Sequence, residues 1–196
     1  MSVQVLFEEA LKATQAWHAS LPNARGFCPW PDQVDYQPRQ AHALPAAKLI
    51  IDAPGHASKA SMPLLTALQA IAPFIEWRHT YTEDQVGKHF LDNFGWFELA
   101  GPTGHFVTHE TRITAAYWGP GLLYARHQHA PEELYTVVSG GGMFHVDGEE
   151  DRWLGPGQTR YHASNQPHAM TMQKEPIVTL VFWRGEGLAD PPRMSA

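Results

Sequence analysis

The second half of this chain is a succession of short apolar segments separated by turn residues, and this pattern limits the fold more than any other feature. From Trp96 onward, segments rich in Val, Tyr, Phe, Thr and Trp alternate with the turn sequences GPTG, GPG, SGGG, DG, GPG and NQP. Many short strands at such spacing indicate a sandwich or a barrel. Asp147-Gly148, between two apolar segments, predicts a hairpin turn. We therefore expect a mainly β domain over residues 96–196.

The first half has helical periodicity instead. Val3, Phe7 and Leu11 recur at the spacing of one helix face and predict a helix at the N-terminus. A second helix is predicted across Pro63–Ile71, with Ser61 as its N-cap and the proline near the first turn.

A third helix is predicted after Thr82, where Gln85 would complete a capping box and Gly95 would end the helix. Residues 20–58 are rich in Pro, Gly and Ala and are predicted to be loop with little regular structure. Residues 1–95 are therefore expected to form a helical N-terminal extension packed on the barrel.

Composition narrows the possible functions. The formal net charge of -6 argues against a nucleic-acid partner, since phosphate binding needs a basic face. The single cysteine, Cys28, excludes a disulfide within the chain and favours a reducing, cytoplasmic location. The N-terminus lacks the features of a signal peptide, and no apolar run is long enough to cross a bilayer, so no membrane association is expected.

Four polar or aromatic side chains around one turn indicate a metal site. His127 and His129 are two residues apart, so on a strand they point to the same face. After the Ala130-Pro131 turn, Glu133 and Tyr135 converge in the same way on the next strand. Two imidazoles and a carboxylate suit one divalent transition metal, with Zn or Fe as the first expectation and Mn, Co or Ni as further candidates.

The stretch GLLYARHQHAPEELYTVVSG matches the first cupin motif, G(x)5HxH(x)3E(x)6G, at every position. The resemblance implies a double-stranded β-helix barrel with the metal inside. Cupins take a third histidine from a second motif, and His168 has the matching distance from Gly157. Ala163 and Asn165 replace the proline and the second glycine of that motif, which puts its turn geometry in doubt. His162 is the rival ligand, but its spacing does not fit the motif.

The neighbouring residues should have other roles. Arg126 and Gln128 alternate with the histidine pair and should face outward. The other histidines are expected at the surface or in hydrogen bonds, and His145 is the one expected to line the barrel.

Further motifs resemble the cupin-type dimethylsulfoniopropionate (DMSP) lyases, most closely their Q-type branch. They are a tyrosine three residues before the histidine pair, the E-x-Y step, and the segments FGWFELAGPTGHF, TAAYWGPGLLYARHQHAPEELY and SNQPHAM. The resemblance covers roughly the last 120 residues well and the helical half loosely. It implies a carbon–sulfur lyase that cleaves DMSP to acrylate and dimethyl sulfide by base-catalysed β-elimination. A small-molecule substrate and a monomer or homodimer are expected.

The resemblance implies that Tyr124 is the general base and that Tyr135 lies at or near the metal. A dication favours the anionic form of a tyrosine, whose reference pKa is about 10, so a tyrosinate base is chemically reasonable. Regular strand alternation would instead point Tyr124 away from the metal, because Tyr124 is an odd number of residues from His127. The turn at Gly119–Gly121 could permit a bulge that turns Tyr124 inward. Tyr135 shares the parity of Glu133 and needs no such irregularity.

A sulfonium substrate needs aromatic surface, because cation–π contact suits a soft, poorly hydrated cation. We single out Trp183 for this role; the other candidates are Trp118, Phe144, Tyr161 and Trp96.

Three other functions are alternatives for a cupin metal site, and the sequence supports them to different degrees. An Fe(II)-dependent dioxygenase acting on a small thiol or carboxylic acid would use the same ligands. A non-catalytic sensor would usually carry a DNA-binding helix pair, for which the acidic chain offers no support. A sugar-phosphate isomerase would need basic inward-facing residues, and few are present.

Overall fold

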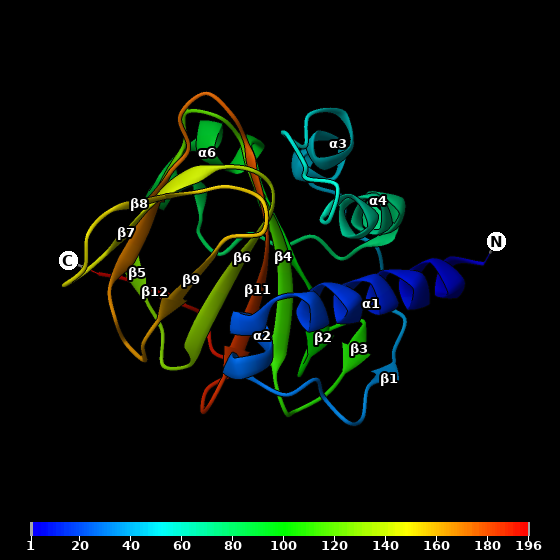
Figure 1. Ribbon diagram of the computed structural model, residues 1–196. Coiled ribbons are helices and arrows are strands. Elements are labelled where there is room, and N and C mark those ends of the chain that lie inside the picture. Colours follow the sequence, from blue (N-terminus) through cyan, green and yellow to red (C-terminus); the bar gives the residue numbers. More distant parts are fainter. Residues whose placement is uncertain (1, 196) are drawn as a thin grey trace.

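Two β-sheets face each other to form a barrel, and helices cover the outer face of the larger sheet (Figure 1). The structure is a computed structural model, and it describes residues 2–195. The helices are α1 (Val3–Ser20), α2 (Pro22–Phe27), α3 (Pro45–Asp52), α4 (Met62–Ile71), α5 (Glu83–Val86) and α6 (Lys88–Asp92), with a 3₁₀ turn over Ala72–Phe74. The strands are β1 (Asp35–Tyr36), β2 (Phe94–Gly101), β3 (Phe106–Val107), β4 (Arg112–Trp118), β5 (Leu123–Gln128), β6 (Glu132–Gly140), β7 (Gly142–Val146), β8 (Arg152–Leu154), β9 (Thr159–His162), β10 (His168–Thr171), β11 (Ile177–Arg184) and β12 (Arg193–Met194).

The larger sheet has the order β1-β3-β2-β4-β11-β6-β9, and the smaller has the order β12-β5-β10-β7-β8. All pairs are antiparallel except β2 with β3. The segment with Asp147-Gly148 joins β7 to β8, which pair as a hairpin, as predicted. The chain is therefore mainly β, with the cupin barrel and the helical N-terminal half that its sequence predicted.

Both faces of the larger sheet are buried, so its central strands are apolar along most of their length. On β11, Val178, Leu180 and Phe182 belong to the core under the helices. Val181 and Trp183, on the alternate face, belong to the core inside the barrel. Helices α1 to α4 thus bury one side of the sheet, whereas Phe90 of α6 belongs to the core inside the barrel. The inner side is left to build a site.

Helix α1 lies across this outer face (Figure 1). Phe7 and Trp17 are buried against the sheet, and the Trp17 indole Nε1 donates to Thr136 Oγ1 on β6 at 2.9 Å. Because the helices and the sheet share one core, we propose that residues 1–95 are an extension of the barrel that needs it in order to fold.

Three details of the helical half differ from expectation. Residues 20–58 contain α2, α3 and β1, because their prolines begin helices as well as interrupt them. The helix after Thr82 is two short helices, since Gly87 between them has φ +79°. Gly95 does not end a helix: it lies in β2, where α3 approaches so closely that an added Cβ would be 2.7 Å from Ala46 Cβ.

Of the two predicted caps, the one at Ser61 is absent and the one at Thr82 is present. The Ser61 side chain makes no cap hydrogen bond to α4 and instead bonds to Ser58. At α5, Thr82 and Gln85 form the predicted capping box, in which the backbone N–H of Thr82 donates to Gln85 Oε1 at 2.9 Å.

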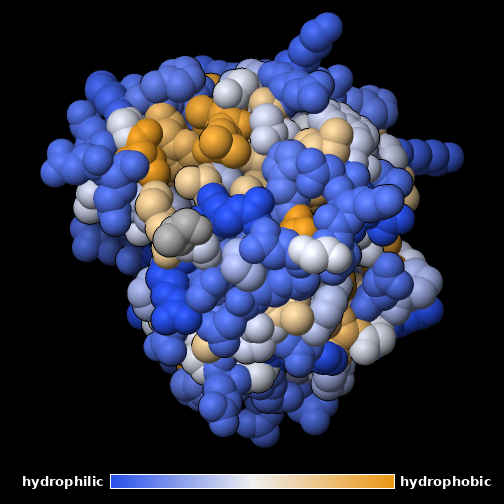
Figure 2. Space-filling model, turned by 90° about the vertical axis from the view of Figure 1, so that its left-hand side faces the viewer, coloured by the Kyte–Doolittle hydropathy of each residue, from blue (hydrophilic) through white to orange (hydrophobic). Residues whose placement is uncertain are grey.

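The face formed by the smaller sheet is mostly hydrophilic, with one hydrophobic cluster (Figure 2). Large exposed apolar residues on the strands of this sheet are Leu123, Trp153 and Met194. Across residues 2–195, no helix has both the length and the apolar character needed to cross a membrane.

Candidate metal centre and active site

The four predicted ligands meet inside the barrel. His127 on β5 is directly opposite His168 on β10, while Glu133 comes from β6 in the facing sheet. Ligand nitrogens of His127, His129 and His168 all lie within 4.8 Å of one another. Glu133 Oε2 is 3.2 Å from Nε2 of both His129 and His168. All four side chains are buried, so the group is a closed pocket of metal-binding atoms.

Backbone carbonyls fix which nitrogen of each histidine faces the centre. Nδ1 of His127, His129 and His168 donates to the carbonyls of Ala125, Pro131 and Gln166 at 2.8–2.9 Å. This leaves the Nε2 lone pairs for a ligand. Nε2 of His129 and of His168 is buried without any hydrogen-bond partner among the described residues. Nε2 of His162 is buried without such a partner as well. Because buried polar atoms are normally satisfied, a divalent metal bound to these nitrogens would account for them.

The charges of Glu133 and His127 suit a cation, whereas Glu133 raises the pKa of His129, which must lose its proton to bind a metal. Burial alone would raise the pKa of Glu133, but His129, His162 and His168 together hold it well below its usual value. Burial and the neighbouring His168 lower the pKa of His127 well below 6.5. An ionised carboxylate and a neutral imidazole are the forms that bind metals.

His162, which the sequence offered as the rival ligand, lies in the site. It lies on β9 opposite Glu133, and its Nδ1 is 2.7 Å from Glu133 Oε2. Its ring stacks on His168 with centroids 3.8 Å apart. Together with Glu133 and His168 it forms a second possible metal-binding group. Motif spacing argued against this residue, but the pairing of β9 with β6, and not sequence distance, places it beside Glu133.

Tyr124 points into the barrel beside His127, with ring centroids 4.3 Å apart. The pairing of β5 with β10 is irregular between His127 and Tyr124, and this bulge reverses the parity that alternation would impose. Tyr135 also faces inward, 5.4 Å from the ring of His162. Burial raises the pKa of both phenols well above 10, so each is protonated unless a cation lies close.

Trp183 lies against Glu133 rather than presenting a free ring. Its Nε1 donates to Glu133 Oε1 at 2.7 Å. Its ring is in contact with the Arg112 guanidinium, 4.8 Å from Cζ to the ring centre, and with His129, 4.3 Å between centroids. The indole therefore positions Glu133 and is already engaged with a cation.

A small cavity of about 50 Å³ adjoins these residues. Strand β4 contributes one complete face to it, as alternation along RITAAYW allows; the lining residues are Thr80, Phe94, Trp96, Arg112, Thr114, Ala116, Trp118, Tyr124, His127, Glu133, Tyr135, Val181, Trp183 and Pro192. Sequence reasoning did not single out Arg112 or Thr80, although the period-2 pattern places Arg112 on the same face as Trp118.

The structure also places His145 and the turn of the second cupin motif. His145 points away from the barrel interior: its Nδ1 is 2.8 Å from Asp151 Oδ2, and its Nε2 is 3.0 Å from Thr171 Oγ1, so the expectation that it lines the barrel is wrong. The substituted second motif keeps its turn, because Asn165 adopts φ +55° and asparagine tolerates this region. Its N–H donates to the His129 carbonyl at 2.8 Å, which ties the turn to the site.

A double-sheet barrel with inward histidines and a glutamate on facing strands defines a cupin, here with a site able to hold one metal. Comparison with known proteins identifies the family within the cupin class. The dimethylsulfoniopropionate lyase family matches residues 31–179. DMSP lyase DddQ of Ruegeria pomeroyi is 34% identical over 180 residues, which are 92% of this chain and 90% of that protein.

Two solved structures of DMSP lyases are similar to this chain over nearly its whole length. One chain from the crystal structures of the DMSP lyases RdDddP and RnDddQII has a TM-score of 0.97, 54% identity and full coverage of both chains. The crystal structure of DddQ from Ruegeria pomeroyi has a TM-score of 0.90 and 32% identity, and covers 97% of this chain and 96% of that one. The chain belongs to the DMSP lyase family and is an enzyme of the lyase class.

Proposed function

We propose that this enzyme cleaves DMSP to acrylate and dimethyl sulfide by β-elimination, with one divalent metal held by His127, His129, Glu133 and His168. The observation that carries the proposal is the inward-turned Tyr124, whose ring contacts a ligand histidine at the edge of the cavity. Zn and Fe are our first candidates for the metal, because the donor set of imidazole and carboxylate suits both.

The reaction removes the proton next to the carboxylate. Tyr124 accepts this proton on Oη, the C–H electrons form the double bond of acrylate, and the C–S bond breaks so that dimethyl sulfide leaves with its electron pair. A bound metal would supply Lewis-acid stabilisation of the negative charge that develops on the carboxylate. Because burial raises the pKa of the Tyr124 phenol, the tyrosinate needs that positive charge nearby in order to form.

The aromatic end of the cavity suits the sulfonium. The rings of Phe94, Trp118 and Tyr124 pack against one another with centroids 5.3–5.6 Å apart, and all three line the cavity. Trp183 was the first candidate from sequence, but its ring already contacts Arg112. We therefore propose Trp118 as the main cation–π partner, with Trp183 as the alternative.

A comparison of Trp118→Leu with Trp183→Leu tests the assignment. Trp118→Leu should lower the affinity for the sulfonium and keep the metal. Trp183→Leu should also disturb Glu133.

The decisive experiment is to measure the metal content of the purified protein and then dimethyl sulfide above a DMSP solution. Full activity under nitrogen is expected, since the elimination involves no redox change. Oxygen consumption that accompanies product formation would instead support the cupin dioxygenase, which would use the same ligands.

A further inference from the structure

Arg112, at the start of β4, is a buried cation in the cavity wall. Only 6% of its surface is exposed, and it lines the same cavity as Tyr124 and His127. A buried arginine normally uses its donors on protein acceptors. The contacts of Arg112 therefore show whether any donor remains for a ligand.

Four residues hold the guanidinium in place. Its Nε donates to Glu98 Oε2 at 2.9 Å, and Nη1 donates to the Leu188 carbonyl at 3.1 Å. The rings of Trp96 and Trp183 contact it, with Cζ 5.0 and 4.8 Å from their centres. Among residues 2–195, no acceptor hydrogen-bonds to Nη2. A guanidinium has five N–H groups in a rigid fork, so Arg112, which lines the cavity, keeps donors that no described residue uses.

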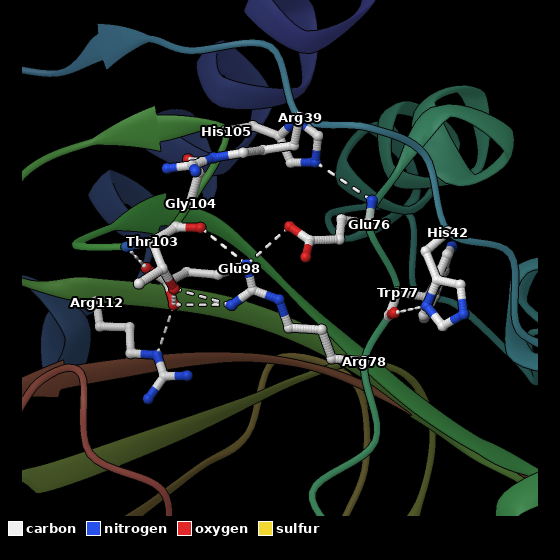
Figure 3. Close-up of polar contacts among 10 residues, drawn as sticks. All are labelled: Arg39, His42, Glu76, Trp77, Arg78, Glu98, Thr103, Gly104, His105 and Arg112. Atoms are coloured by element: carbon white, nitrogen blue, oxygen red, sulfur yellow. Dashed lines mark hydrogen bonds and ion pairs between the residues drawn. The ribbon is translucent and has the colours of Figure 1, made fainter.

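Glu98 is the counter-ion that keeps Arg112 in the wall. Figure 3 shows Glu98 between the side chains of Arg78, Thr103 and Arg112. It accepts from the Thr103 N–H at 2.7 Å and from Thr103 Oγ1 at 2.8 Å, and lies 3.7 Å from Arg78 Nη1. Arg78 is paired with Glu76 as well, at 2.9 Å. Arg78 thus shares this ion network without lining the cavity.

Sheet register places Arg112 near the metal ligands. Trp183 pairs with Arg112 on one side and with Glu133 on the other, so the three residues form one row across the inner face. Adjacent strands are about 4.8 Å apart, so the backbones of Arg112 and Glu133 are roughly 10 Å apart. A short carboxylic acid in the cavity can therefore be near the metal ligands and also meet the Arg112 fork.

We propose that Arg112 binds the substrate carboxylate and so selects for an acid whose positive group lies at the opposite, aromatic end of the cavity. This proposal rests on the proposed function. Arginine and carboxylate form strong charge-assisted hydrogen bonds of fixed geometry. A sulfonium at the same place would be repelled by Arg112, so the charge pattern of the cavity also sets the direction in which the zwitterion enters.

The test divides the substrate into its two halves. Propionate carries the carboxylate, and ethyldimethylsulfonium carries the cation; each is used as a competitive inhibitor of DMSP cleavage by the metal-loaded enzyme. In Arg112→Met, the inhibition constant of propionate should rise about 10-fold or more, as expected for loss of a charged hydrogen bond. The inhibition constant of ethyldimethylsulfonium should stay the same or fall, and KM for DMSP should rise more than kcat falls.

Arg78→Met is the matched control, because it disturbs the same ion network outside the cavity and should change neither inhibition constant. Arg112→Met combined with Glu98→Gln keeps the test usable if the single variant folds poorly, since it leaves no unpaired buried carboxylate. Unchanged propionate inhibition in either Arg112 variant would overturn the proposal, as would parallel loss of both inhibitors. A wild-type enzyme that releases no dimethyl sulfide would instead contradict the proposed function.

Discussion

Each histidine that we propose as a metal ligand is oriented by a hydrogen bond made close to it in sequence. Nδ1 of His127, His129 and His168 bonds to a carbonyl two residues away, so the orientation is set by the local strand or turn. His162 differs, because its Nδ1 is used on Glu133 itself. This difference in hydrogen bonding predicts a difference in metal affinity between otherwise similar substitutions.

We predict that His129→Ala, Glu133→Ala and His168→Ala each lose the metal and the activity, since three remaining ligands hold a divalent ion weakly. His162→Ala should keep the metal, with affinity lowered by about 10- to 100-fold as is typical for loss of a supporting hydrogen bond. Metal analysis after dialysis against a weak chelator measures this. Retention of metal by His168→Ala together with its loss in His162→Ala would reverse the two roles.

The two tyrosines should be separable by their hydroxyl groups alone. Tyr124→Phe keeps the ring volume among Phe94 and Trp118, so we expect normal folding and metal content with turnover lowered by about 10²- to 10⁴-fold. Tyr135→Phe should instead change metal affinity or substrate placement.

The pH profile gives a second readout of the base. Wild-type turnover should rise with pH as the tyrosine ionises, and this limb should disappear in Tyr124→Phe. Near-normal turnover with an unchanged profile in that variant would exclude Tyr124 as the base.

At the scale of elements, close approach of α3 to β2 explains a glycine that sequence reasoning had assigned to a helix end. An ideal Cβ at Gly95 would lie 2.7 Å from Ala46 Cβ and 3.1 Å from the Trp77 ring. Gly95→Ala should therefore destabilise the protein by about 1–3 kcal/mol through overpacking.

Gly26→Ala is the control for this prediction, because Gly26 is in α2 and an added Cβ there meets nothing within 4 Å. It should be neutral or slightly stabilising. Urea unfolding of both variants measures the difference, and equal stability would show that α3 can move away from β2 at little cost.

At the scale of the whole molecule, buried histidines link stability to pH. His105 stacks on Phe7 with centroids 4.3 Å apart, and burial lowers its pKa from 6.5 to about 4. Above pH 6.5 both the folded and the unfolded states leave it neutral, so it has no effect. Between pH 6.5 and about 4 the unfolded state binds a proton that the folded state does not, so stability falls as pH falls.

This residue should contribute roughly 2 kcal/mol of destabilisation at pH 5 relative to pH 8. His105→Gln should therefore reduce the difference in unfolding free energy between the two pH values. Denaturant unfolding at both values provides the measurement. A variant with the same pH dependence as the parent would place the responsible groups elsewhere, such as at His162, whose pKa burial also lowers to about 4.

Local sequence alone determined the class of fold and the central part of the site. Turn residues and strand periodicity indicated the barrel, and the spacing of His127, His129 and Glu133 predicted a convergent metal group, because both signals act within one or two adjacent strands. The roles of the ligands and tyrosines stay predictions until the variants are measured.

Tertiary structure decided the rest, because it depends on pairing between distant strands. The bulge that turns Tyr124 inward arises where β5 pairs with β10, and His162 reaches Glu133 only because β9 lies beside β6. Register in the same way decides that His145 points outward and that Arg112 lies in one row with Trp183 and Glu133. Sequence distance fixes neither the partner of a strand nor its register, since burial of apolar surface across the whole barrel selects both.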